Sequence, residues 1–159
     1  MVLEIRYAKE SDSENLWKWR NDPITREFSR NSDEIPWESH VKWYGKALEN
    51  PSKKIFVGVS EGVGIGRIMF DRLEGNIAET GIVIAPEGRG KGHGSELIRS
   101  SSERYFSIEN GVDEILAEIL KINPASIRAF EKAGYVKREG YQRYGDERDN
   151  KYYFYFLTR

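Results

Sequence analysis

The sequence predicts an α/β fold with a mixed sheet, in a single domain over residues 1–159. Two observations lead to this class. Apolar residues alternate with polar ones in some segments and recur at helical spacing in others, and these two patterns interleave along the chain. In addition, 159 residues are enough for one hydrophobic core and too few for two independent domains.

The first part of the chain is predicted to hold one strand and two helices. Residues 3–8 alternate as a strand. Ser11 and Glu14 have the spacing of a capping box at the start of a helix, which Asp22-Pro23 ends. Pro36 is expected at the first position of the second helix. The apolar face of that helix is expected to consist of Trp37, Val41, Tyr44 and Leu48.

The middle of the chain is predicted to contain three strands and a helix. The strands are joined by short turns, which predicts an antiparallel meander over residues 55–60, 65–73 and 77–84. A glycine-rich loop then leads into a helix that ends near residue 110. The inward face of this helix is expected to carry Leu97, Ile98, Tyr105 and Phe106.

The last part of the chain is predicted as a strand, a helix and two strands. Residues 115–120 form a buried strand. The helix begins at Asn123-Pro124 and ends at Gly134, because glycine readily adopts the left-handed cap. Residues 135–144 and 152–157 form the closing strands. The second of these is apolar at successive positions, which is typical of a strand covered on both faces.

Composition excludes several classes of function. Lys and Arg number 25 against 26 for Asp and Glu, so no net field attracts nucleic acid or an anionic membrane. There is no Cys and the two His residues lie far apart, so we expect no metal. No apolar run approaches the roughly 18 residues that cross a bilayer. We therefore expect a soluble, cytoplasmic protein.

The loop between residues 88 and 94 has the features of a phosphate site. Backbone N–H groups at the start of a helix are unpaired and attract anions. Three alternating glycines permit positive φ and close approach of a ligand, and two cations add charge. The pattern matches neither a P-loop nor the dinucleotide fingerprint. The residues expected to bind are Arg89, Gly90, Lys91, Gly92, His93 and Gly94.

Two motifs together resemble the GNAT family of N-acetyltransferases. The first is Arg/Gln-x-x-Gly-x-Gly/Ala, which begins here at Arg89. The second is Asn-x-x-Ser/Ala-x-x-x-Tyr/Phe-x-x-x-Gly-Phe, which begins at Asn123. The resemblance implies a GNAT fold, with a mixed seven-stranded sheet flanked by about four helices. It also implies direct transfer of an acetyl group from acetyl-CoA, as co-substrate, to a primary amine.

The resemblance also implies roles for individual positions. Main-chain groups of Val83 and Ile84 hold the pantetheine arm and polarise the thioester carbonyl. The main chain of residues 89–94 binds the pyrophosphate. Asn123 contacts the pantetheine, and Lys132 reaches a cofactor phosphate.

An acetyl transfer to an amine also needs a base and a proton source for the departing thiolate. Glu79 is the expected base, because it is an acidic residue in an otherwise apolar strand, where burial raises a carboxyl pKa. Family members often protonate the thiolate with a Tyr, but Phe130 stands at that position here. The general acid is therefore left open among Tyr135, Tyr141, Tyr144 and water.

The acceptor amine is only partly indicated. The segment around Trp17 and Trp37 resembles the PseH-like branch, which acetylates a nucleotide-linked 4-amino-4,6-dideoxy sugar. Arg20 and Asn21 are then candidate substrate contacts, and Arg20 suits a diphosphate. The acidic turn 146–149 favours a polycation instead, so polyamine and protein N-terminal acetyltransferases remain alternatives. A non-catalytic acyl-CoA-binding module is another, and a homodimer is a candidate assembly.

Overall fold

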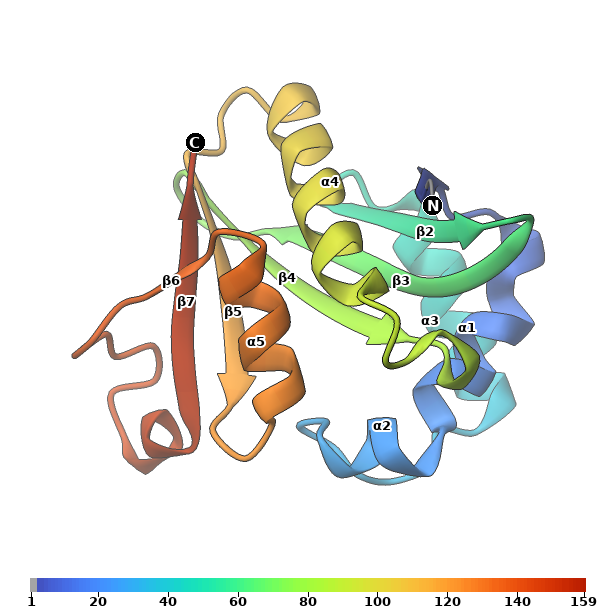
Figure 1. Ribbon diagram of the computed structural model, residues 1–159, viewed down its shortest axis with the longest axis horizontal. Helices are drawn as coiled ribbons and strands as arrows, with labels where there is room; N and C mark the ends of the chain where they lie inside the picture. Colours follow the sequence, from blue (N-terminus) through green and yellow to red (C-terminus); the bar gives the residue numbers. More distant parts are fainter. Residues whose placement is uncertain (1–2) are drawn as a thin grey trace.

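The computed structural model describes residues 3–159, which form a seven-stranded sheet with helices on both faces (Figure 1). The strands are β1 (Leu3–Tyr7), β2 (Lys53–Ser60), β3 (Val63–Arg72), β4 (Ile77–Ile84), β5 (Glu114–Leu120), β6 (Val136–Lys137) and β7 (Tyr152–Thr158). The helices are α1 (Ser13–Asn21), α2 (Pro23–Glu27), α3 (Trp37–Glu49), α4 (His93–Ile108) and α5 (Pro124–Lys132). The predicted α/β class and mixed sheet are confirmed, and the short α2 is an addition.

The sheet opens into a V between its two central parallel strands. Its order is β1-β2-β3-β4-β5-β7-β6, and only β4 and β5 pair in parallel. Their pairing stops at Thr80 and Ala117, although β4 continues to Ile84 and β5 to Leu120. The two strands diverge beyond this point, and α2 lies across the open end (Figure 1). The carboxyl ends of both strands therefore border one gap.

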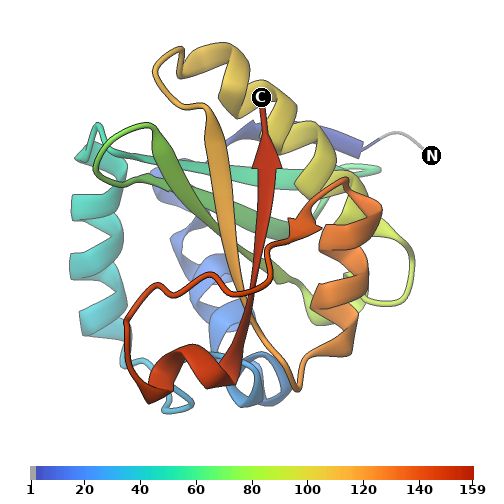
Figure 2. The same cartoon turned by 90° about the vertical axis from the view of Figure 1, so that its left-hand side faces the viewer.

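Helices cover the two faces of the sheet separately. α4 and α5 pack on one face, where Leu97, Ile98 and Phe130 join the largest hydrophobic cluster. α1 and α3 pack on the other, around Trp19 and Tyr44. Figure 2 shows α3 and α5 on opposite sides of the sheet. We call these the α5 face and the α3 face.

The predicted strand over residues 135–144 is wrong for most of its length, because β6 contains only two residues. Only Val136 and Lys137 pair with β7, and Gly140 has a positive φ of 76°. The chain then crosses the α3 face, where the Tyr141 ring stacks on Phe154 and Phe156 at centroid distances of 5.2 and 5.0 Å. This cover explains why β7 is apolar on both faces, as predicted.

The predicted capping box of the first helix is also wrong. α1 begins at Ser13 after a 3-10 turn over Glu10–Asp12. Asp12, and not Ser11, organises this start: it accepts the Lys9 N–H at 2.8 Å and two hydrogen bonds from the Arg6 guanidinium, each of 2.8 Å. The paired carboxylate fixes the end of β1 against the helix.

The inward face of α3 differs from the predicted one. Its buried residues are His40, Tyr44 and Ala47, whereas Trp37, Val41 and Leu48 are 39%, 44% and 37% exposed. Hydrogen bonds of two buried polar side chains fix which face of α3 points toward the sheet. The Tyr44 hydroxyl donates to the Lys9 carbonyl at 2.7 Å, and the His40 Nε2 lies 3.1 Å from the Ser13 hydroxyl.

No helix within residues 3–159 has the length and apolar character needed to cross a membrane.

Candidate active site

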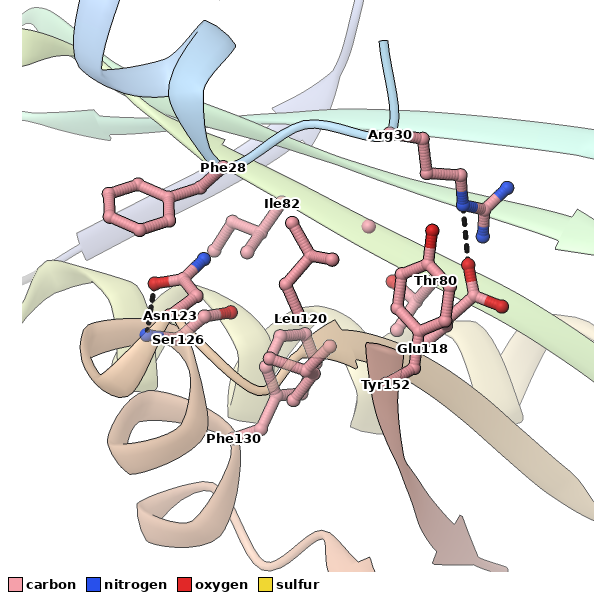
Figure 3. A pocket seen from close by; sticks show the side chains of 12 residues that line it. Phe28, Arg30, Thr80, Ile82, Glu118, Leu120, Asn123, Ser126, Phe130 and Tyr152 are labelled. Carbon is pink, nitrogen blue, oxygen red and sulfur yellow. Dashed lines mark hydrogen bonds and ion pairs between the residues drawn. The ribbon is translucent and has the colours of Figure 1, made fainter. Parts of the chain in front are cut away.

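A cavity of about 120 Å³ occupies the gap between β4 and β5 (Figure 3). It is lined from both faces of the sheet, because the strands no longer pair there. Residues that reach it from the α5 face are Asn123, Ser126 and Phe130, and those from the α3 face are Arg30, Glu118 and Tyr152. Two reactants that approach from opposite faces would therefore meet inside the sheet.

The α5 side of the cavity presents two hydrogen-bond donors. Asn123 Oδ1 accepts the Ser126 N–H at 3.2 Å and caps α5, which leaves the amide nitrogen directed toward Ile82 (Figure 3). Within the described chain, no hydrogen bond involves the Ser126 hydroxyl. Phe130 follows one turn later on the same helix and is 2% exposed.

The α3 side of the cavity is a network of opposite charges. Arg30 places Nε 2.5 Å from Glu118 Oε2 and Nη2 3.1 Å from Glu79 Oε1. Arg143 pairs with both carboxylates, at 3.3 Å from Glu118, and the Tyr144 hydroxyl donates to Glu118. Desolvation and this hydrogen bond raise the pKa of Tyr144 to about 12. The Glu118 side chain is only 1% exposed.

The environment predicted for Glu79 is therefore wrong. The sequence placed this carboxylate against apolar walls, whereas two guanidinium groups hold it. Glu79 does not line the cavity, and Glu118 does. The same signal, an acidic residue in an apolar strand, also marks Glu118 within Glu114–Leu120 and could have indicated it. Glu79 lies opposite Leu116, so Glu118 stands two residues closer to the gap.

The glycine loop enters α4 in the expected manner. Gly90 and Gly92 have positive φ values of 75° and 78°, and a Cβ added to either would meet no atom within 4 Å. Gly92 is the N-cap of α4. Gly94 differs from the expectation of positive φ: it lies in the first turn of α4, and a Cβ added to it would lie 3.7 Å from the Ala129 Cβ of α5. The loop surface beside the first two glycines is open to a ligand.

The charged side chains of this loop are arranged differently from the prediction. The Arg89 guanidinium donates to Asp22 Oδ2 at 2.7 Å and to the Thr25 hydroxyl at 2.9 Å, so it fastens the loop to α2 and is not a free cation. Desolvation opposes ionisation of Asp22, but the Arg89 hydrogen bond and the Thr25 N–H hold its pKa below the usual value. Lys91 is exposed, and the His93 side chain is buried.

The remaining cofactor residues are placed as follows. The Val83 side chain belongs to the cluster on the α3 face and that of Ile84 packs on the α5 face. Neither residue lines the cavity, and both lie on β4 beyond its pairing with β5. Lys132 is exposed at the last turn of α5. Within residues 3–159, no three His, Asp or Glu side chains are grouped so that they could hold a metal ion.

Comparison with known families decides the assignment. The family model described as "Acetyltransferase (GNAT) domain" matches residues 3–136, which is most of the chain. The chain belongs to the GNAT family. It is accordingly an acyltransferase, and the two motifs that indicated this family frame the gap described above.

Proteins similar to this GNAT acetyltransferase include one sequence relative and several solved structures. The acetyltransferase PseH of Campylobacter jejuni is 24% identical over 134 residues, which cover 82% of this chain and 83% of that protein. Among solved structures, the aminoglycoside acetyltransferase AAC(6')-Ib with coenzyme A and kanamycin has a TM-score of 0.81 at 20% identity, covering 99% of this chain and 95% of that one. The Vibrio cholerae spermidine N-acetyltransferase with CoA and spermine has a TM-score of 0.79 at 20% identity, covering 98% and 95%.

Three arginines, Arg20, Arg26 and Arg67, lie close to one another, and Arg67 contacts a residue of the cavity. Arg20 donates to the Asn31 carbonyl at 2.9 Å, and its Nη1 is buried with no partner in the described chain. Arg67 donates to the carbonyl of Gly81, a cavity residue, at 3.2 Å. Desolvation, together with the nearby Arg20, lowers the pKa of Arg67 to about 10. Desolvation and the nearby Arg26 likewise lower the pKa of Arg20. Among residues 3–159, no carboxylate pairs with these three side chains.

Asn21, predicted to contact the substrate, serves the scaffold. Its amide nitrogen donates to the Ile35 carbonyl at 2.9 Å, and its amide oxygen accepts the Ile35 N–H at 2.8 Å. Both polar atoms are used, so the side chain holds the segment between α2 and α3. Arg20, and not Asn21, therefore remains the candidate substrate contact.

Proposed function

We propose that this protein transfers the acetyl group of acetyl-CoA to the primary amine of a nucleotide-linked amino sugar. The observation that carries the choice of acceptor is the excess of arginine over free carboxylate on the α3 side of the gap. The coenzyme approaches from the α5 face and the acceptor from the α3 face. The similarity to PseH supports the PseH-like resemblance from which the sequence implied this class of acceptor.

The residues present fit acetyl-CoA. The main chain of the open glycine loop, from Arg89 to Gly94, binds the pyrophosphate at the start of α4. Val83 and Ile84 pair with β3 but lie beyond the pairing of β4 with β5, so main-chain groups on the β5 side of this segment are available to the pantetheine. Asn123 directs its amide nitrogen into the same gap. Lys132, exposed in the last turn of α5, is the cation proposed for a cofactor phosphate.

Glu118 is the proposed base in this reaction. The amine nitrogen attacks the thioester carbonyl carbon, a C–N bond forms, and the C–S bond breaks with its electron pair on sulfur. The nitrogen loses a proton, which Glu118 accepts because its carboxylate lines the cavity on the acceptor side. Glu79, the base predicted from the sequence, acts through the shared arginines.

The charge balance favours an anionic acceptor over a polycation. Glu79 and Glu118 are each paired with arginine, whereas Arg20, Arg26 and Arg67 add positive charge with no carboxylate partner in the part of the chain that the structure describes. Polyamines and aminoglycosides would meet like charge, whereas a diphosphate is recognised well by guanidinium groups.

Two of the three carboxylates in the acidic turn that suggested a polyamine, Asp146 and Asp149, are paired within the turn. Asp146 pairs with Arg148 at 2.7 Å, and this hydrogen bond lowers the pKa of Asp146 to about 2. Asp149 accepts three main-chain N–H groups, from Arg143, Tyr144 and Gly145. The turn therefore has no free carboxylate pair to offer a polycation.

The cytoplasmic location and the homodimer expected from the sequence stay predictions.

The variant Arg20→Lys tests the proposed acceptor. We expect KM for a nucleotide-linked 4-amino sugar to rise about tenfold, because Lys keeps the charge but loses the bidentate geometry. The melting temperature should stay the same, since Lys suits the end of α1 equally well. Arg99→Lys, on the exposed side of α4, serves as the control and should leave KM unchanged. A lower melting temperature with unchanged KM would place Arg20 in the scaffold and remove the main support for this acceptor.

A further inference from the structure

We propose that the Ser126 hydroxyl stabilises the departing CoA thiolate in place of a phenol. This inference rests on the proposed function, because it requires the thioester in the β4/β5 gap. It starts from the residue that follows Ser126 by one turn: Phe130 lines the same cavity and has no proton to give. A leaving sulfur on this side still needs a donor.

The sulfur leaves toward the α5 side of the cavity. The glycine loop leads directly into α4, which packs on the α5 face together with α5, so the coenzyme arm reaches the gap from there. The α3 side is filled by the network of Arg30 and Glu118, where the amine is activated. The acyl carbon lies between the two, and the C–S bond points away from the attacking nitrogen.

Few hydroxyl groups are available at this place. Thr80 donates to the Met69 carbonyl at 2.9 Å, and Tyr144 donates to Glu118. Tyr135 is 2% exposed, and its hydroxyl lies 2.8 Å from that of Ser102. Tyr152 lines the cavity from the α3 face, on the acceptor side (Figure 3).

Among the described residues, Ser126 offers an unused hydroxyl on the α5 side of the cavity. It lines the cavity from the α5 face, and its hydroxyl forms no hydrogen bond within the described chain. It is also the third residue of α5, where the helix dipole favours negative charge. The amide nitrogen of Asn123, directed into the same cavity, is a second donor.

The step balances without another reactant. As the C–S bond breaks, its electron pair moves to sulfur and the Ser126 O–H donates a hydrogen bond to the thiolate. Hydrogen bonds to charged groups are stronger than neutral ones. The amine proton passes to Glu118 and from there to solvent, and water protonates the thiolate on release. Ser126 keeps its own proton.

Ser126→Ala, studied by calorimetry with CoA and desulfo-CoA, tests this role. Desulfo-CoA has no sulfur, so its affinity should be the same in wild type and variant. The wild-type protein should bind CoA more tightly than desulfo-CoA, and the ratio of the two affinities should grow as the pH rises and the thiol ionises. This ratio of affinities should fall about tenfold in Ser126→Ala, and kcat should fall by a similar factor. Ser107→Ala, far from the gap on α4, is the matched control and should change neither value.

A second variant guards against a general packing effect. Ser126→Ala combined with Phe130→Tyr returns a hydroxyl to the same cavity and should recover most of the lost turnover. An unchanged CoA preference and unchanged kcat in Ser126→Ala would overturn the inference. Wild-type protein that fails to bind desulfo-CoA would instead overturn the proposed function, so the two failures are distinguishable.

Discussion

Glu118→Gln is expected to lower kcat about 100-fold or more at neutral pH, with little change in acetyl-CoA affinity. The substitution preserves the shape of the side chain but removes the carboxylate that takes the amine proton. The loss should shrink at high pH, where the amine deprotonates without assistance. Steady-state rates from neutral to alkaline pH, with cofactor affinity from calorimetry, measure both effects.

Glu79→Gln is the matched control for this prediction. It removes the other carboxylate that Arg30 and Arg143 share, but one that does not line the cavity. We expect a smaller loss of kcat than for Glu118→Gln. If Glu79→Gln were the more damaging change, the original sequence-based assignment of the base would be right. If both variants kept full turnover, neither carboxylate would be the base.

Gly92→Val is expected to weaken acetyl-CoA binding at least tenfold, or about 1.4 kcal/mol. Gly92 has a positive φ of 78° and caps α4, so a β-branched residue both strains the loop and fills the space beside its N–H groups. Isothermal titration of acetyl-CoA measures the loss directly.

Gly75→Val separates strain from lost binding. Gly75 has a similar φ of 74°, and an added Cβ there would also meet no atom within 4 Å. It precedes β4, whereas Gly92 lies beyond the other end of that strand. Gly75→Val should lower the melting temperature about as much as Gly92→Val and leave acetyl-CoA affinity unchanged. Normal affinity in Gly92→Val would remove this loop from the cofactor site.

The parts of the site made by backbone could be predicted from the sequence. A glycine at a helix start, as at Gly92, and an Asn-Pro pair that begins a helix, as at Asn123, follow from local conformational preferences. These preferences do not depend on what the rest of the chain does. Both motifs consequently appear in the structure where the sequence placed them, at the starts of α4 and α5.

The side-chain chemistry depended on contacts between distant segments. Glu79 was expected against apolar walls, but Arg30 and Arg143 come from segments far away in the sequence to pair with it. Arg89 was predicted to be a free phosphate ligand, but Asp22, the N-cap of α2, pairs with it. Which face of α3 is buried likewise depends on the hydrogen bond from the Tyr44 hydroxyl to the Lys9 carbonyl. Hydrophobic periodicity cannot predict such a bond.

Release of free CoA thiol from acetyl-CoA, measured across a panel of amines, tests the central claim most directly. The panel contains a UDP-linked 4-amino sugar, spermidine, kanamycin and an N-terminal peptide, each with wild type and with Glu118→Gln. We expect the highest kcat/KM with the UDP-linked sugar, and loss of that activity in the variant. Turnover that is faster with spermidine or kanamycin would contradict the proposed acceptor, and no thiol release with any amine would contradict acetyl transfer itself.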